Sequence, residues 1–193
     1  MLSQPLFEGR RVRLDRFDAD KDATVVARWT HDLDWLQRIE ARKVARPLAA
    51  ARVREHWASL EKSDSTFLFA VRLNSDGRLV GQAAIGEVYW MHRSATIRLG
   101  IATPADRRQG FGGEALALLV RYAFDELNLH RLTAWTQEYN PQAARFLERA
   151  GFVPEVRQRQ ALQRNGRRWD VIVLGLLREE WERARSGPGE AEP

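Results

Sequence analysis

The sequence contains no cysteine among its 193 residues, and this absence excludes several kinds of chemistry. Without thiols there is no disulfide framework, no thiolate zinc site, no iron–sulfur cluster and no cysteine nucleophile. The four histidines, His31, His56, His92 and His130, are too far apart for a zinc-binding HExxH motif. We therefore expect no metal site.

Long apolar runs are also missing. The first 14 residues lack the apolar stretch of a signal peptide, and the longest apolar run, 171–177, is far too short to span a membrane. A cytoplasmic protein with no membrane partner is expected. The length predicts a single domain over 1–185, and the segment 186–193, which has no apolar residue able to dock, is expected to be a flexible tail.

Lysine is scarce, because only Lys21, Lys43 and Lys62 are lysines among 31 basic side chains, and the net charge is +5. An arginine bias can indicate anion or nucleic-acid binding, but a GC-rich coding sequence produces the same bias. The arginines are dispersed along the whole chain, without a block of five or six. Charge alone therefore does not predict a nucleic-acid partner.

The hydrophobic periodicity switches repeatedly between the spacings typical of strands and of helices, which predicts an α+β fold with a mostly antiparallel sheet. Asn165-Gly166 is a strong hairpin signal. Strands are expected at 10–15, 66–73, 78–90, 94–103, 131–137, 155–163 and 168–177. Helices are expected from Asp20 or Asp22 to Trp29, from Pro47 past Leu60, at 113–127 and at 141–150.

A glycine-rich segment between a strand and a helix is the most informative feature of the sequence. It reads Arg107, Arg108, Gln109, Gly110, Phe111, Gly112, Gly113. Unpaired N–H groups and the partial positive charge at a helix start favour an anion, glycines allow its close approach, and arginines add charged donors. A phosphate or pyrophosphate site is predicted, and a glycine-rich turn without a ligand is the alternative.

Two nucleotide-binding motifs fit this segment poorly. Gly110, Gly112 and Ala115 match the G-x-G-x-x-A spacing of dinucleotide folds, but the glycines do not follow their strand directly. A P-loop needs Gly-Lys-Ser/Thr, whereas Gly113 precedes Glu114.

The segment instead resembles the Q/R-x-x-G-x-G/A motif of the GNAT N-acetyltransferases, with Arg107, Gly110 and Gly112 at the defined positions. The similarity continues in Asn140 and the helix ending FLERAGF, which resemble the family's N-x-x-S/A and LYEKLGF segments. The opening LFEGRRVRLDRFDADKDA and the ending NGRRWDVIVLGLLREEW are similar to those of the RimJ/RimL-like branch. The resemblance implies a GNAT fold with a splayed strand pair at an acetyl-CoA cleft, and direct acetyl transfer to an amine.

The resemblance also implies which residues hold the cofactor, acetyl-CoA. The segment 107–113 would bind its pyrophosphate, and the pantetheine would lie along the strand ending at Ile101, Ala102 and Thr103. Asn140 would bind the cofactor near the same cleft. Its other interpretation, an N-cap before a proline, is equally physical and compatible with that role.

For the base that deprotonates the amine, Glu87 is the leading candidate, since it aligns with a glutamate of polyamine-acetylating relatives; His92 is the second. The ordinary alternatives are that Glu87 is a solvated strand residue and that His92 is a loop residue. Thr96 stands where many RimJ/RimL-like proteins carry glutamate. Leu147 and Ala143 stand where relatives carry a tyrosine or a serine, so water or another group protonates the thiolate, or activity has been lost.

The acceptor pocket is expected to combine aromatic and acidic side chains, which suit a cationic amine. Its candidates are Trp29, His31, Asp32, Asp34, Trp35, Tyr89 and Trp90, although tryptophans that simply fill the core are the ordinary alternative. The expected acceptor is a protein N-terminus first, and a polyamine or antibiotic-like amine second. A non-catalytic acyl-CoA-binding or regulatory module is the rival hypothesis, and a homodimer is a reasonable expectation.

Overall fold

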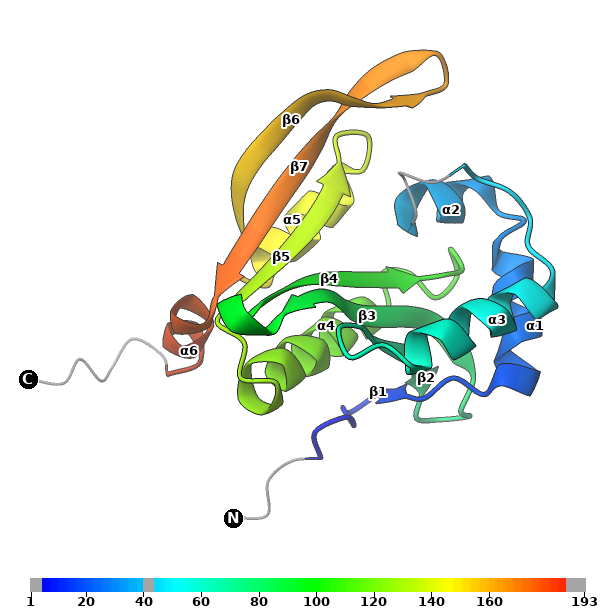
Figure 1. Cartoon of the computed structure of the whole chain (residues 1–193), viewed down its shortest axis with the longest axis horizontal. Helices are drawn as coiled ribbons and strands as arrows, with labels where there is room; N and C mark the ends of the chain where they lie inside the picture. Colours follow the sequence, from blue (N-terminus) through cyan, green and yellow to red (C-terminus); the bar gives the residue numbers. More distant parts are fainter. Residues whose placement is uncertain (1–4, 40–43, 187–193) are drawn as a thin grey trace, which may run out of the picture.

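A seven-stranded sheet with the order β1-β2-β3-β4-β5-β7-β6 forms the centre of the computed structural model, which describes residues 5–39 and 44–186 (Figure 1). Its strands are β1 (Val12–Asp15), β2 (Phe67–Leu73), β3 (Leu79–Tyr89), β4 (Ser94–Ile101), β5 (Arg131–Gln137), β6 (Val153–Arg164) and β7 (Arg167–Leu177). Every neighbouring pair is antiparallel except β4 and β5, which are parallel. The α+β prediction with a mostly antiparallel mixed sheet is confirmed.

Helices cover both faces of this sheet. They are α1 (Ala19–Trp29), α2 (Leu33–Ile39), α3 (Ala50–Glu61), α4 (Phe111–Arg121), α5 (Pro141–Arg149) and α6 (Arg178–Ser186), with a 3-10 turn η1 (Trp90–His92) and a π-helical turn η2 (Tyr122–Glu126). Side chains of α4 and α5 share one hydrophobic core, and side chains of α1, α2 and α3 share a second. No helix in the described parts of the chain is long and apolar enough to cross a membrane.

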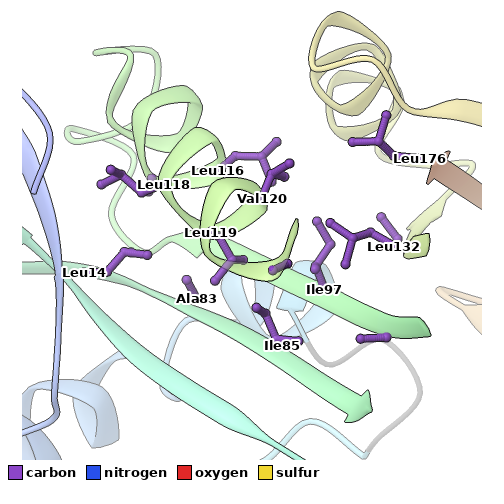
Figure 2. Close-up of a cluster of buried hydrophobic side chains, with 14 of the residues drawn as sticks. Leu14, Ala83, Ile85, Ile97, Leu116, Leu118, Leu119, Val120, Leu132 and Leu176 are labelled. Atoms are coloured by element: carbon purple, nitrogen blue, oxygen red, sulfur yellow. The ribbon is translucent and has the colours of Figure 1, made fainter. Parts of the chain in front are cut away.

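The helix expected at 113–127 corresponds to α4, whose apolar side chains lie against the sheet. Leu116, Leu119 and Val120 are at most 3 % exposed, and Figure 2 shows Leu119 between the helix and the sheet, near Ala83 and Ile85. Because the helix is anchored along its length, its first turn is held at the end of β4.

Two predictions about helix starts need correction, and two helices were not predicted. The N-cap of α1 is Asp18, whose carboxylate accepts from the amide of Asp20, whereas Asp22 is buried and bound to Arg72 at 2.5 Å. The helix expected from Pro47 begins at the start of α3, three residues later. The helices α2 and α6 were not predicted, because segments of seven and nine residues contain too few helical repeats of apolar residues.

The hairpin of β6 and β7 extends away from the rest of the sheet (Figure 1). Asn165 and Gly166 have φ values of 51° and 71°, the left-handed pair that a tight two-residue hairpin turn requires, so this prediction is confirmed. After β7 the chain forms α6, which includes Ser186. The tail expected over 186–193 therefore begins inside a helix, and 187–193 lie outside the described residues.

Candidate active site

The parallel strands β4 and β5 separate after a short contact. Ser94, Ala95 and Thr96 pair with β5, and beyond them β4 and β5 no longer pair with each other, although β4 stays paired with β3 and β5 with β7. A cavity of about 1090 Å³ opens there, lined by β4, β5, α2, α4 and α5. Among the described residues, the buried Thr136 Oγ1 and Gln137 Oε1 on the open part of β5 have no hydrogen-bond partner. Buried polar atoms are normally paired, so this wall suits a ligand with polar groups along its length.

The start of α4 supplies unpaired amides at one end of the cavity. Gly110 is the N-cap residue with a φ of 83°, a left-handed conformation that favours glycine, and no side chain caps the helix. The first intrahelical bond runs from the Glu114 amide to the Gly110 carbonyl at 3.2 Å. The amides of Phe111, Gly112 and Gly113 precede it and therefore have no intrahelical acceptor. This geometry fits a bound phosphate.

Contacts with β1 hold this glycine segment from outside. The Glu114 carboxylate accepts from the amides of Arg11 at 2.7 Å and Val12 at 3.3 Å, and the Arg11 guanidinium donates to the Gln109 carbonyl at 2.7 Å. Burial opposes ionisation of Glu114, but the hydrogen bonds from Arg11 and Val12 outweigh it and lower the pKa of this carboxyl. These contacts hold the glycine segment in place and leave the amides of Phe111, Gly112 and Gly113 free to bind a ligand.

The side chain of Arg107 faces protein oxygens, contrary to the expectation of a direct charged contact with pyrophosphate. Its guanidinium donates to the carbonyls of Ile101 at 3.1 Å and Ala102 at 2.7 Å, and to Asp34 at 3.0 Å. Arg107 therefore fixes the end of β4 to the glycine segment. Arg108 is exposed and donates to no described residue, so it remains available to an anion.

The predicted cofactor residues divide into two groups. Those that line the cavity are Ile101, Arg107, Arg108, Gly110, Gly112, Gly113 and Asn140. The cavity lining does not include Ala102, Thr103, Gln109 and Phe111. The Thr103 hydroxyl donates to Asp106 at 2.6 Å, so its proton is already used by a protein carboxylate.

Asn140 connects the two sides of the open cleft. It stands at the N-cap position of α5, but its side chain makes no capping hydrogen bond. Its Oδ1 instead accepts from Arg38 of α2 at 3.1 Å, and Arg38 is paired with Asp34 at 2.9 Å. Asp34 in turn accepts from Arg107, so one polar chain joins α2, the glycine segment and α5. Burial opposes ionisation, but the bonds from both arginines lower the pKa of Asp34.

Glu87 lies at the cavity, next to the point where β4 and β5 separate. The Thr96 hydroxyl donates to its Oε2 at 2.8 Å, and its Oε1 is 3.7 Å from Nη2 of Arg98. The backbone of Glu87 has a φ of 52° within a bulge between β3 and β4. Thr96, at the position where the resembling branch often carries glutamate, thus holds a carboxylate supplied by the neighbouring strand.

Most of the other predicted site residues lie outside the cavity. His92, Tyr89 and Trp90 are exposed around η1, and none of them lines the cavity. Trp29 is buried in the core, and Asp32 accepts from two amides at the start of α2. This placement supports neither a catalytic role for His92 nor an acceptor-binding role for the others, namely Trp29, Asp32, Tyr89 and Trp90.

Trp35 is the predicted acceptor residue that the structure brings to the cavity. It is 3 % exposed, and a Cβ added to Gly100 of β4 would come within 2.6 Å of its ring. This close approach of α2 to β4 requires a glycine and forms part of the cavity wall. His31 is exposed beside the N-terminus of α2 and does not line the cavity.

None of the described residues that line the cavity is a tyrosine that could act as the general acid. Leu147 and Ala143 both line the cavity, and neither can donate a proton. The hydroxyl of Tyr139 donates to the Gln37 carbonyl at 2.8 Å, outside the cavity. Arg38 and Arg98 also line the cavity and were not predicted from the sequence, although alternation along β4 places Arg98 on the same face as Thr96. Within the described residues, no group of histidines and carboxylates could hold a metal ion.

A parallel strand pair that opens beside a glycine-rich helix start defines the acyl-CoA-dependent N-acyltransferase class. The family model for the acetyltransferase (GNAT) domain matches residues 11–153. The chain belongs to this GNAT family and is an acetyl-CoA-dependent N-acetyltransferase, as the names of its homologues also indicate.

Its sequence relatives include two Bacillus subtilis proteins. The chain is 33% identical to "Probable N-acetyltransferase YjcK" over 68% of this chain and 72% of that protein. It is 30% identical to "Putative ribosomal N-acetyltransferase YdaF" over 67% of each chain. Among solved structures, a Vibrio cholerae spermidine N-acetyltransferase in complex with CoA and spermine matches with a TM-score of 0.80 and 21% identity, over 89% of this chain and 98% of that one. This structural similarity confirms the fold.

Proposed function

We propose that this enzyme transfers the acetyl group of acetyl-CoA to a primary amine in the cleft between β4 and β5, as a member of the RimJ/RimL-like branch. The acceptor is a protein N-terminus, with a small amine such as a polyamine as the second candidate. One observation carries the proposal: the open strand pair has unpaired helix amides at one end and the Glu87 carboxylate at the other.

The cavity residues fit acetyl-CoA as the co-substrate. The amides of Phe111, Gly112 and Gly113, together with the partial positive charge of α4, bind the pyrophosphate, and Arg108 adds a guanidinium at the same end. The pantetheine arm lies along the part of β4 that is not paired with β5, where Gln137 across the cleft offers an unpaired polar atom. Acetyl-CoA supplies an activated acyl group as a thioester.

Glu87 accepts the proton that the acceptor ammonium must lose before its nitrogen can attack, directly or through one water. The Thr96 hydroxyl orients this carboxylate. A nitrogen–carbon bond to the acetyl group forms, the carbon–sulfur bond breaks, and the electron pair leaves with the thiolate. A reference thiol pKa of about 8.5 means that water can protonate the thiolate without a side-chain acid. Leu147 and Ala143 are compatible with this chemistry.

The experiment that tests the proposal measures thiol release from acetyl-CoA with a panel of peptides, polyamines and aminoglycosides. We expect release that depends on both the amine and the enzyme. Glu87→Gln should reduce the rate and change its pH dependence. Binding of acetyl-CoA without thiol release for any amine would instead support the non-catalytic acyl-CoA-binding interpretation.

A further inference from the structure

The cavity reaches both faces of the sheet, and β4 separates them. Alternation along β4 turns Ile97 into the core beneath α4 and turns Thr96, Arg98 and Gly100 to the opposite face, where Trp35 of α2 contacts Gly100. The amides at the start of α4 and the Glu87 carboxylate therefore lie at different ends and on different faces. An acceptor reaching Glu87 meets the side chains of the α2 face.

The arginines around the cavity differ in how their donors are used. Arg38 and Arg107 share Asp34 and donate to further protein oxygens. Three cavity-lining arginines donate hydrogen bonds to no described residue: Arg98, Arg108 and Arg149. Arg108 and Arg149 belong to the glycine segment and to α5, on the cofactor side. Arg98 is on the acceptor side.

Arg98 has unused donors at a position where the acceptor must pass. Its one ion pair among the described residues is with Glu87, and the 3.7 Å separation is too long for a hydrogen bond. Its side chain is 51% exposed, and a guanidinium carries five N–H donors in a planar fork that matches a carboxylate. A second carboxylate can therefore bind to Arg98 while Glu87 remains in place.

Carboxylates that could receive a second ammonium group are scarce in the cavity. Of the described residues that line it, Glu87 and Asp106 are acidic. Asp106 is 7 % exposed and accepts two bonds from Arg78, at 2.8 and 2.9 Å, and one from Thr103. Its charge is therefore already matched. A polyamine bound with one nitrogen at Glu87 would bring another positive group close to Arg98, and like charges repel.

We propose that the acceptor amine of this enzyme carries a carboxylate that binds to Arg98, within a few ångströms of the amine that Glu87 deprotonates. This inference rests on the proposed function and specifies its substrate class. Two sources share the chemistry: a free amino acid, and a peptide N-terminus with a short acidic side chain near it. Arg98 is then the residue that determines acceptor specificity, and polyamines are poor substrates.

The test compares acceptors that differ in a single charge, using the full chain and steady-state thiol release from acetyl-CoA. Amidated peptides with aspartate, asparagine or lysine at the second position are compared with free aspartate and with spermidine. We expect KM for the aspartate peptide to be about tenfold lower than for the asparagine peptide, within the range that a charge-assisted hydrogen bond spans. Free aspartate as the better substrate would identify the small-molecule source.

Substitutions test whether Arg98 causes the preference for the aspartate peptide over the asparagine peptide. Arg98→Gln should raise KM about tenfold for the carboxylate-bearing acceptor and so abolish the difference in KM between the aspartate and asparagine peptides, and Arg98→Lys should retain part of this difference. Arg54→Gln on α3 removes the same charge outside the cavity and should leave the preference intact. Thermal unfolding of each variant shows whether it is folded.

Several outcomes would overturn the proposal. Equal KM values for the aspartate and asparagine peptides, or a preference for spermidine or the lysine peptide, would exclude a carboxylate-bearing acceptor. These comparisons use the unmodified enzyme and do not depend on the folding of a variant. A preference that survives in Arg98→Gln would assign it to another residue. Thiol release with none of the amines would instead refute the proposed function itself.

Discussion

Replacing Gly112 by aspartate tests the anion site at the start of α4 in one measurement. A Cβ added to Gly112 would lie 3.6 Å from Ile101 and 3.8 Å from Phe146, which are ordinary contact distances. The fold should therefore tolerate the substitution, and an acidic side chain in the first helical turn even adds about 0.3–1 kcal/mol of stability. The melting temperature of the free variant should equal or slightly exceed that of the original protein.

The effect on cofactor binding should be large. A ligand at a hundred times its Kd stabilises the protein by about 2.7 kcal/mol. At about 2–4 °C per kcal/mol for a chain of this size, that is a rise of roughly 5–11 °C in Tm. A carboxylate about 4 Å from a phosphate charge costs about 4 kcal/mol at an effective dielectric constant near 20, which weakens binding about a thousandfold. The same acetyl-CoA concentration should then leave the Tm of Gly112→Asp almost unchanged.

The control variant is Gly112→Asn, which has nearly the same shape without the charge. It should retain a clear part of the acetyl-CoA-induced rise in Tm, measured by differential scanning fluorimetry at matched ionic strength. A full rise in Gly112→Asp would refute the reasoning, because the pyrophosphate would then lie away from these amides. Equal losses in both variants would mean that size, and not charge, limits binding.

Three further perturbations separate chemistry, electrostatics and packing. Glu87→Gln should lower kcat by about 10²–10⁴-fold with little change in acetyl-CoA binding, and an unchanged rate with an unchanged pH profile would remove Glu87 from the mechanism. Hydrogen bonds from Arg78 and Thr103 lower the pKa of Asp106, so the stabilising effect of its carboxylate is complete above about pH 4 and is lost as the pH falls through the folded-state pKa. Urea unfolding of Asp106→Asn should therefore show a free energy of unfolding that is lower by about 1–2 kcal/mol at pH 7, and by less at pH 3. A decrease that does not depend on pH would contradict this assignment. Gly100→Ala should destabilise by about 1–3 kcal/mol and raise KM for the acceptor, because the new methyl group would displace α2; unchanged Tm and KM would show that α2 moves freely.

The glycine segment and the strands around it could be predicted because their signals are local. The spacing of Gly110 and Gly112 between a strand and an apolar helix predicts an anion site at the helix start without knowledge of distant contacts. The partners of Arg107 could not be predicted in this way, because one of them, Asp34, is distant in sequence and belongs to α2. A helix of seven residues has too few turns to show a clear apolar period, so the position of α2 depends on tertiary packing.

Glu87 shows why alternation alone misplaces a site residue. Strict alternation along β3 would put Glu87 on the same face as Ile85, in the core beneath α4. The bulge between Gly86 and Tyr89 shifts the pattern by one residue, so that Val88 is buried and the carboxylate turns to the cavity. A bulge depends on how two strands pair, and the sequence of a single strand does not reveal it.

In the mechanism proposed above, the same bulge makes Glu87 a residue at which stability and catalysis conflict. A left-handed conformation costs an ordinary L-residue about 1–2 kcal/mol, a cost that glycine at this position would avoid. Selection for stability alone would therefore favour the loss of this carboxylate. Laboratory evolution toward thermal tolerance, without an activity screen, should recover substitutions at position 87 among the first stabilising changes. Selection for acetyl transfer should retain the strained glutamate and place stabilising substitutions elsewhere.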